Sequence, residues 1–78
     1  MTVLVYSTPT CPFCRKTKIF LDNHAIVYRD RNVQEDEMAA KEMIQKSGQM
    51  GVPVIEINGE IVVGFDQKKI KKLLHINV

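Results

Sequence analysis

Both cysteines of the chain, Cys11 and Cys14, lie in the segment "TPTCPFCRK", separated only by Pro12 and Phe13. Two thiols at this spacing can form a structural disulfide, supply half of a metal site, or cycle between dithiol and disulfide. A disulfide that closes so short a loop removes little entropy from the unfolded chain, and small secreted domains normally use several bridges. The spacing therefore disfavours the structural disulfide, which stays open as an alternative that requires inert thiols, and it favours the redox couple or the metal site.

A metal site needs more donors than these two thiols. Structural zinc takes four ligands, and beyond the cysteines the chain offers only His24 and His75, at spacings unlike those of a zinc finger or ribbon. We expect both histidines to be surface or helix-capping residues. Two chains could still share an iron–sulfur cluster through their four cysteines, so a dimeric metal or cluster carrier remains the alternative of another class.

The elements around the cysteines favour the redox couple. Residues 2–7 form a β-branched and aromatic run that predicts a buried strand, and residues 12 to about 23 predict a helix that begins at Pro12. Cys11 then lies at the helix N-terminus, where unpaired N–H groups and the helix dipole stabilise a thiolate. Cys14 lies one turn inside the helix and is better shielded. We therefore predict Cys11 as the nucleophile and Cys14 as the resolving thiol.

The rest of the chain alternates between strand and helix signals. Asn58-Gly59 favours a type I′ turn between two strands, and Asn32 or a neighbour can cap the second helix, which Gly48 ends. The apolar spacing places several helix residues in the core. The further predicted elements are a strand at 25–30, a helix at 35–47, strands at 53–57 and 60–63, and a helix from about 66. The predicted core residues on the helices are Phe20, Leu21, Met38, Ala39, Met43, Ile44, Ile70, Leu73 and Leu74.

This order, β-α-β-α-β-β-α, predicts a single α/β domain over residues 1–78. Two strands joined through a helix should be parallel, and the closing hairpin adds an antiparallel pair, so the four-stranded sheet is mixed and carries three helices. Reaction sites on such sheets lie beyond the carboxyl ends of the parallel strands. Cys11 and Cys14 fall at that edge.

Charge balance and the length of the apolar stretches argue against two classes, nucleic-acid binders and membrane-spanning proteins. Eleven Lys and Arg are nearly balanced by nine Asp and Glu, which does not indicate a nucleic-acid binder. No basic segment precedes an apolar signal-peptide core, and no apolar stretch approaches the ~20 residues needed to span a bilayer, so we expect a cytoplasmic protein without a membrane partner. We also expect a monomer. The basic run at Lys68, Lys69, Lys71 and Lys72 is interpreted as a solvated helix face, with a docking patch as the alternative.

Three segments together resemble a known family. "YSTPTCPFC", "GVPV" and "GFD", in this order and at these separations, are similar to the glutaredoxins, and specifically to the short bacterial glutaredoxin-like redoxins of the thioredoxin superfamily. The resemblance covers essentially all 78 residues. It implies a thioredoxin-like fold and a thiol-disulfide oxidoreductase that reduces protein disulfides. It also implies no tightly bound cofactor, with glutathione or a flavoprotein disulfide reductase as the source of electrons.

The resemblance assigns further site residues. From the residues alone a trans bond before Pro53 is the ordinary expectation, but the resemblance implies a cis Val52-Pro53 bond that faces the dithiol. The backbone of Val52 would then pair with an extended substrate. We also predict that Pro12 and Phe13, which lie between the cysteines, bind the substrate. Three residues match the segment that receives the γ-glutamyl end of glutathione, namely Gly64, Phe65 and Asp66, with Asp66 as the partner of its ammonium.

Three departures from the glutathione-using members bear on the electron donor. These members commonly carry Lys, Tyr and a second acidic residue where this chain has Thr8, Phe13 and Gln67. Loss of one charge-assisted contact costs about 1.5 to 3 kcal/mol, which is a tenfold to hundredfold weakening. Gly64-Phe65 is instead similar to the redoxins that thioredoxin reductase reduces. The alternative is therefore a glutathione-independent redoxin that donates electrons to ribonucleotide reductase or a peroxidase.

Overall fold

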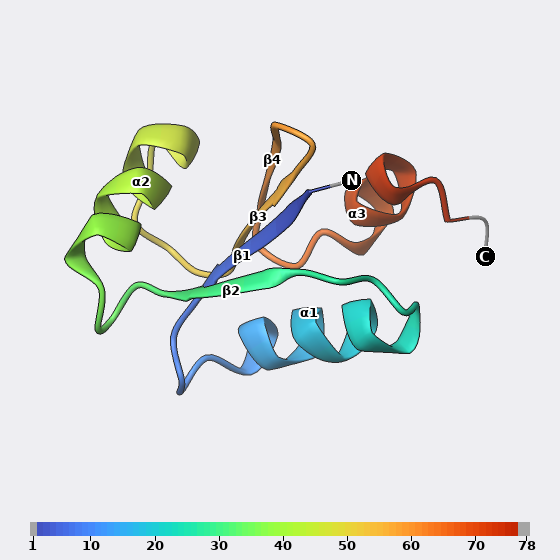
Figure 1. Cartoon of the computed structure of the whole chain (residues 1–78), viewed down its shortest axis with the longest axis horizontal. Helices are drawn as coiled ribbons and strands as arrows, with labels where there is room; N and C mark the ends of the chain where they lie inside the picture. The colour runs from blue at the N-terminus through green and yellow to red at the C-terminus, as the bar shows by residue number, and fades with distance from the viewer. Residues whose placement is uncertain (1, 77–78) are drawn as a thin grey trace.

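The computed structural model describes residues 2–76. Four strands and three helices alternate in the predicted order β-α-β-α-β-β-α (Figure 1). Their bounds are β1 Val3–Ser7, α1 Pro12–Asn23, β2 Arg29–Asn32, α2 Glu37–Ser47, β3 Val54–Ile57, β4 Glu60–Val63 and α3 Gln67–Leu74.

The strands form one mixed sheet in the order β2-β1-β3-β4. β1 and β2 are parallel, while β3 pairs antiparallel with both β1 and β4. This confirms the predicted mixed sheet and the thioredoxin-like fold. The hairpin between β3 and β4 turns at Asn58 and Gly59, whose φ angles of 50° and 89° are those of the predicted type I′ turn.

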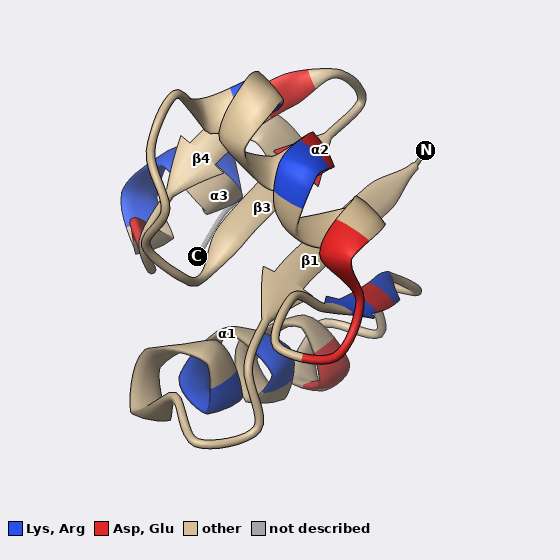
Figure 2. Ribbon diagram, turned by 90° about the vertical axis from the view of Figure 1, so that its left-hand side faces the viewer, with Lys and Arg blue, Asp and Glu red and all other residues tan. Residues whose placement is uncertain are grey.

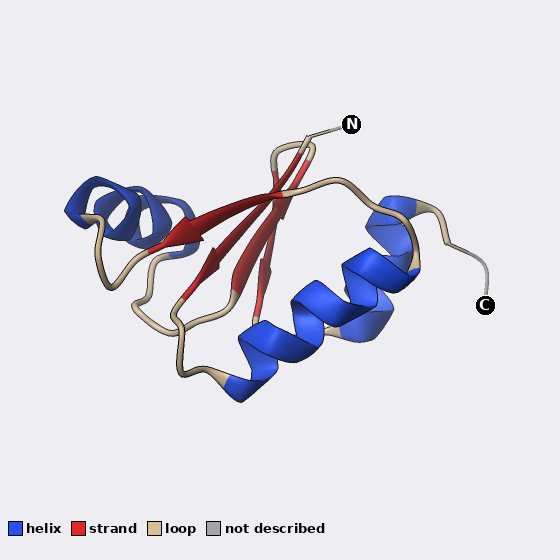
Figure 3. Ribbon diagram, turned by 60° about the horizontal axis from the view of Figure 1, so that its bottom comes forward, coloured by secondary structure: helices blue, strands red, loops and turns tan. Residues whose placement is uncertain are grey.

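Alternate residues of each strand face opposite sides of the sheet and pack against different helices. On one side lie Val3, Val5, Ile55, Ile57 and Val62, which form a core with residues of α1 and α3. On the other side Tyr6 and Val54 pack with Met43 of α2. Figure 3 shows α1 and α3 together on one face of the sheet and α2 on the other. The fold therefore has three layers.

β2 begins at Arg29, so the predicted start at residue 25 was wrong. The preceding residues end α1 instead: the N–H of Ile26 donates to the carbonyl oxygen of Leu21 at 2.9 Å, and Ala25 has a φ of 55°. Ladder pairing with β1 starts only where Leu4 meets Arg29. Ile26 and Tyr28 before the strand pack against the core, whereas Val27 between them is exposed, and this alternation of partly buried and exposed residues is typical of a strand.

α2 begins at Glu37, two residues later than predicted. The side chain of Asn32 accepts the N–H of Gln34 at 2.9 Å and forms a turn before the helix. Asp36 is the N-cap, because its Oδ1 accepts the N–H groups of Met38 and Ala39. Gly48 ends the helix in the left-handed conformation, as predicted.

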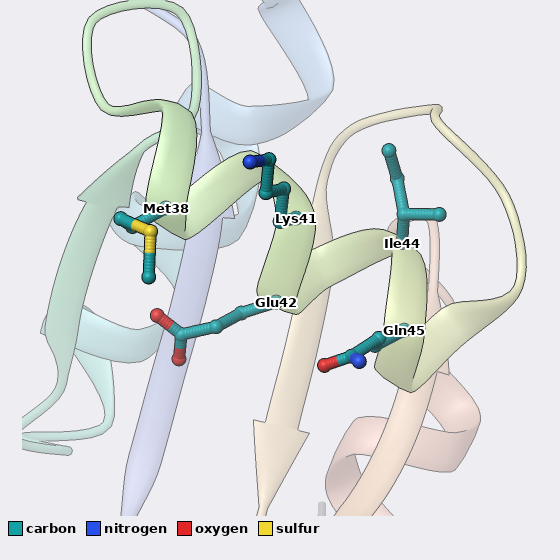
Figure 4. A pocket seen from close by; sticks show the side chains of 5 residues that line it. All are labelled: Met38, Lys41, Glu42, Ile44 and Gln45. Carbon is teal, nitrogen blue, oxygen red and sulfur yellow. The ribbon is translucent and has the colours of Figure 1, made fainter.

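Met38 does not belong to the core, which corrects its prediction as a buried residue. Its side chain is 65% exposed, and Ile44 on the same helix is also exposed. Both line a shallow hollow of about 460 Å³ on α2 together with Lys41, Glu42 and Gln45 (Figure 4). A single helix covers this face of the sheet, so part of the helix circumference has no neighbour. None of the predicted site residues lines this hollow.

Candidate active site

Cys11 is the N-cap of α1. Its backbone is extended, with φ −101° and ψ 112°, and Pro12 begins the helix. The backbone N–H of Cys14 points to Cys11 Sγ at 3.1 Å, so the sulfur occupies the place that a capping oxygen takes in other helices. The loop from β1 to α1 thus holds Cys11 beyond the carboxyl end of β1, as the strand order predicted (Figure 1).

The two sulfurs are joined in a disulfide, with the Cα atoms 5.2 Å apart. They differ in exposure. Cys11 is partly exposed, whereas Cys14 is only 1% exposed. A molecule approaching from solvent therefore meets Cys11 first.

The segment Val52-Pro53 lies against Cys11. The peptide bond between Val52 and Pro53 is cis, as the family resemblance implied. The carbonyl oxygen of Val52 lies 3.9 Å from Cys11 Sγ, and Pro53 is buried. Two segments separated by about half the chain are thereby brought together at one edge of the sheet.

Gly64, Phe65 and Asp66 follow β4 beside this segment. The N–H of Gly64 donates to the carbonyl oxygen of Pro53 at 2.8 Å, and Gly64 has a φ of 80°, which favours glycine. The ring of Phe65 packs edge-on against Phe20 of α1 with centroids 5.9 Å apart. Asp66 is exposed and caps α3, accepting the N–H of Lys69 at 3.2 Å. The structure joins this segment to Pro53 through the Gly64 hydrogen bond, and the ligand roles of the three residues remain predictions.

The two residues between the cysteines face solvent. Pro12 is exposed, and the ring of Phe13 is 56% exposed with the ammonium of Lys16 at 5.1 Å from its centroid. Thr8, in the loop that precedes Cys11, is partly buried. An exposed aromatic ring beside a partly exposed sulfur offers apolar contact to a bound polypeptide.

The family model for Glutaredoxin matches residues 3–62, which span the cysteines, the cis-proline and most of the sheet. The chain belongs to the glutaredoxin family. Membership and the adjacent Cys11–Cys14 pair identify a protein of the thiol oxidoreductase class with a redox-active dithiol motif.

Two curated relatives cover most of this glutaredoxin. A glutaredoxin-like 8.6 kDa protein in the rubredoxin operon of Clostridium pasteurianum is 49% identical over 72 residues, covering 92% of this chain and 96% of that protein. Glutaredoxin 3 of Escherichia coli K12 is 30% identical, covering 82% of this chain and 77% of its own.

Solved structures agree with the fold. The T8A mutant of the thioredoxin-like protein BC3987 superposes with a TM-score of 0.92 at 32% identity, covering 97% of both chains. The glutaredoxin-like NrdH-redoxin from Escherichia coli superposes with a TM-score of 0.84 at 25% identity, covering 94% of this chain and 95% of its own.

A polar network behind the active-site helix was not predicted. Ser7, the last residue of β1, is buried and donates its hydroxyl to Asp30 Oδ1 at 2.6 Å. Lys18 on α1 reaches the other oxygen of the same carboxylate at 2.8 Å. The network ties α1 to β1 and β2 in this glutaredoxin. No local sequence signal marks it, because the three residues meet only once the parallel strands are in register.

The histidines cap helices, as predicted. His24 follows the last turn of α1, and His75, with a φ of 58°, ends α3. Within residues 2–76 no three His, Cys, Asp or Glu side chains gather closely enough to hold a metal ion. In the same range, no helix has the length and apolar character needed to cross a lipid bilayer.

Proposed function

We propose that this glutaredoxin is a dithiol oxidoreductase that reduces disulfides in partner proteins, with residues 1–78 acting as one domain. Cys11 is the nucleophile and Cys14 the resolving thiol. The observation that carries the proposal is the contrast between a partly exposed Cys11 at the N-terminus of α1 and a buried Cys14 one turn inside it.

The position of Cys11 supports its activation. The first N–H groups of a helix have no partner within the helix, and the sum of the peptide dipoles places partial positive charge there. A thiolate at Cys11 would accept the N–H of Cys14, whose nitrogen lies 3.1 Å from the sulfur. Hydrogen bonding and the helix dipole both favour the thiolate over the thiol.

The reaction proceeds by two exchanges. The Cys11 thiolate attacks one sulfur of the substrate disulfide, the substrate S–S bond breaks, and one substrate thiolate leaves while a mixed disulfide forms. The Cys14 thiolate then attacks Cys11 Sγ and releases the second substrate thiolate. Both substrate thiolates take up protons from solvent. Two electrons have passed from the dithiol to the substrate, and Cys11 and Cys14 are left as the disulfide present in this structure.

Substrate binding uses the surface around Cys11. We propose that the backbone of Val52 pairs with an extended substrate segment, with Pro53 shaping this wall of the site. Pro12 and the exposed ring of Phe13 supply the contact on the other side. Gly64, Phe65 and Asp66 extend the surface beyond Pro53. The 2.8 Å hydrogen bond between Gly64 and Pro53, which holds the two segments together, supports this arrangement.

We propose a flavoprotein disulfide reductase, rather than glutathione, as the electron donor. Thr8, Phe13 and Gln67 replace the Lys, Tyr and acidic residue expected in glutathione users. The Escherichia coli NrdH-redoxin, which superposes on this chain, is described as glutaredoxin-like with a thioredoxin-like activity profile. The redox couple would be turned over in the cytoplasm, where reductants keep protein thiols reduced.

The trapping experiment tests the roles of the cysteines. The Cys14→Ser variant is incubated with a peptide that contains one disulfide, and the product is analysed by mass spectrometry. A mixed disulfide at Cys11 is expected, because no second thiol is present to resolve it. The assignment fails if no adduct forms, or if the Cys11→Ser variant forms the adduct equally well.

A reduction assay tests the donor. The oxidised protein is the acceptor, and NADPH consumption is followed with either thioredoxin reductase or glutathione plus glutathione reductase. Faster turnover with thioredoxin reductase is expected. Equal or faster turnover with glutathione would overturn the choice of donor while leaving the dithiol mechanism intact.

A further inference from the structure

The basic residues of this glutaredoxin are concentrated on two helices. α1 and α3, with their capping residues, hold seven of the eleven Lys and Arg but only two of the nine Asp and Glu. Figure 2 shows basic segments on α1 and α3 and an acidic segment before α2. The basic residues are Arg15, Lys16, Lys18, Lys68, Lys69, Lys71 and Lys72.

Both helices pack on the same face of the sheet, so their charges share one layer of the molecule. We call the exposed side of α1 and α3 the basic face. On the opposite layer two of the cations are paired, since Arg31 pairs with Glu42 at 2.8 Å and Lys46 pairs with Glu56 at 2.6 Å, while Lys41 of α2 is exposed. On the basic face only Lys18 has a carboxylate within 4.0 Å among residues 2–76. The basic face therefore carries positive charge that the described part of the chain does not neutralise.

The α1 part of the basic face adjoins the dithiol, and α3 follows the segment that is bonded to Pro53. Arg15 and Lys16 follow Cys14 directly, and the N–H of Arg15 donates to the carbonyl oxygen of Cys11 at 3.1 Å. α3 starts immediately after the segment whose Gly64 donates to Pro53. A polypeptide that crosses Cys11 therefore comes close to the cations of α1, and the cations of α3 on the same layer add to the positive potential that it meets.

A hollow of about 600 Å³ lies on this side between α3 and β4. Lys68, Lys69 and Lys72 line it, and Lys69 Nζ donates to the carbonyl oxygen of Ile61 at 3.0 Å. The hollow also contains the carboxylates of Asp66 and Glu60 and the side chain of Leu73. Its three ammonium groups exceed its two carboxylates, so the hollow favours an acidic side chain.

We infer that the basic face selects protein disulfides whose cysteines are flanked by Asp and Glu. This inference rests on the proposed function and adds the substrate class to it. Complementary charge raises the rate of encounter, and like charge between protein and substrate lowers it. The selection therefore acts mainly on the association rate and weakens as salt screens the charges.

Anionic lipid surfaces and nucleic acids would also be attracted to lysines. A protein substrate is favoured here because the cations of α1 follow the dithiol directly and Lys16 lies against the exposed ring of Phe13, which a polypeptide can contact. The overall charge of only +2 is also small for a nucleic-acid binder.

The test uses two fluorogenic peptides that share one disulfide and differ only in flanks of Glu or Lys. The reduced protein is mixed with each peptide, and the second-order rate constant of reduction is measured at low and high salt. We expect the Glu peptide to react about tenfold faster at low salt, and the two rates to converge near 1 M salt, where the Debye length is about 3 Å.

Charge-reversal variants test which lysines cause the preference for the Glu peptide. The double variant Lys68→Glu, Lys72→Glu is expected to lose most of the preference for the Glu peptide. Lys41→Glu is the matched control, because this exposed lysine lies on α2 on the other face of the sheet. The control should keep the preference of the original protein.

Two results would overturn the inference. Equal reduction of both peptides would show that charge does not select the substrate. Binding to phosphatidylglycerol vesicles or duplex DNA that depends on Lys68 and Lys72, without any peptide preference, would assign the basic face to those surfaces. If neither peptide is reduced, the proposed function itself fails, which is a distinct outcome.

Discussion

The backbone N–H of Cys14 lies 3.1 Å from the sulfur of Cys11, so one cysteine of the pair caps the first turn that contains the other. α1 is also held against the sheet by Phe20 and Leu21 in the core, so we expect this helix N-terminus to stay in place when the disulfide is reduced. The same backbone group that orients Cys11 can therefore stabilise its thiolate. The buried Cys14 remains within reach of the Cys11 sulfur.

Cys11 should be the reactive thiol of the reduced protein. In the Cys14→Ser variant we expect iodoacetamide to alkylate Cys11 at neutral pH about tenfold faster than a free cysteine, because the helix N-terminus increases the thiolate fraction. Mass spectrometry over a time course gives the rate. In the Cys11→Ser variant the buried Cys14 should react at least about tenfold more slowly than Cys11. Similar rates for the two variants would contradict the assignment.

Asp36 should stabilise the protein by capping α2. Replacement by Ala removes the acceptor for the N–H groups of Met38 and Ala39, which lie 3.0 and 3.2 Å from its Oδ1. A loss of about 1 kcal/mol in the free energy of unfolding is expected, measured by urea denaturation. Asp36→Asn keeps the acceptor and should lose much less. An equal loss in both variants would point to the charge near Arg31 instead of the cap.

Lys46 should stabilise the fold in a pH-dependent way. Hydrogen bonds to Glu56 and then to Tyr6 raise its pKa above the ordinary 10.5. The folded state therefore favours the protonated lysine, and this stabilisation is complete below pH 10.5 and lost as the pH rises through the folded-state value. Lys46→Met should cost about 1 kcal/mol at neutral pH, since the side chain is partly exposed.

Denaturation of the Lys46→Met variant at several pH values checks this sign. The difference from the original protein should be constant from neutral pH to about pH 9 and should shrink above the ordinary lysine value. Lys41→Met, in which an exposed lysine is replaced, should show no such trend. A difference that grows with alkaline pH would mean that the network does not favour the charged form.

Leu21 should be essential to the core that holds α1 against the sheet. It is fully buried, and Leu21→Ala should cost about 2 to 5 kcal/mol. Ile19, two residues away on the same helix, is 52% exposed, and Ile19→Ala should change stability by less than about 0.5 kcal/mol. Thermal denaturation of the two variants measures the contrast. Comparable losses would mean that α1 buries a different face.

Local patterns predicted most of the fold because their physical causes are local. Pro12 began α1, Gly48 ended α2, and Asn58-Gly59 formed the hairpin turn, since each depends on the φ angles that its own residues allow. The boundaries of β2 and α2 failed for a different reason. Ile26 and Asn32 form hydrogen bonds that compete with the regular element, and which bond forms depends on the neighbouring strand and helix.

Part of the candidate site could be predicted from the sequence. The spacing of Cys11 and Cys14 and their place after a strand predicted one cysteine at the helix N-terminus and a better shielded one inside the helix, and the structure has both, with Cys11 as the N-cap. The sequence by itself thus determined the chemistry of the pair, because two thiols one helical turn apart at a helix start have few other uses.

Only the tertiary structure decided what surrounds the pair. Packing brought Val52 to 3.9 Å from Cys11 Sγ and placed Ser7, Asp30 and Lys18 in one network. It also put the cations of α1 and α3 on the same face of the sheet, although about three quarters of the chain separates Arg15 from Lys72. These relations depend on strand order and on the face of the sheet that each helix covers, which are long-range properties that no local run of residues specifies.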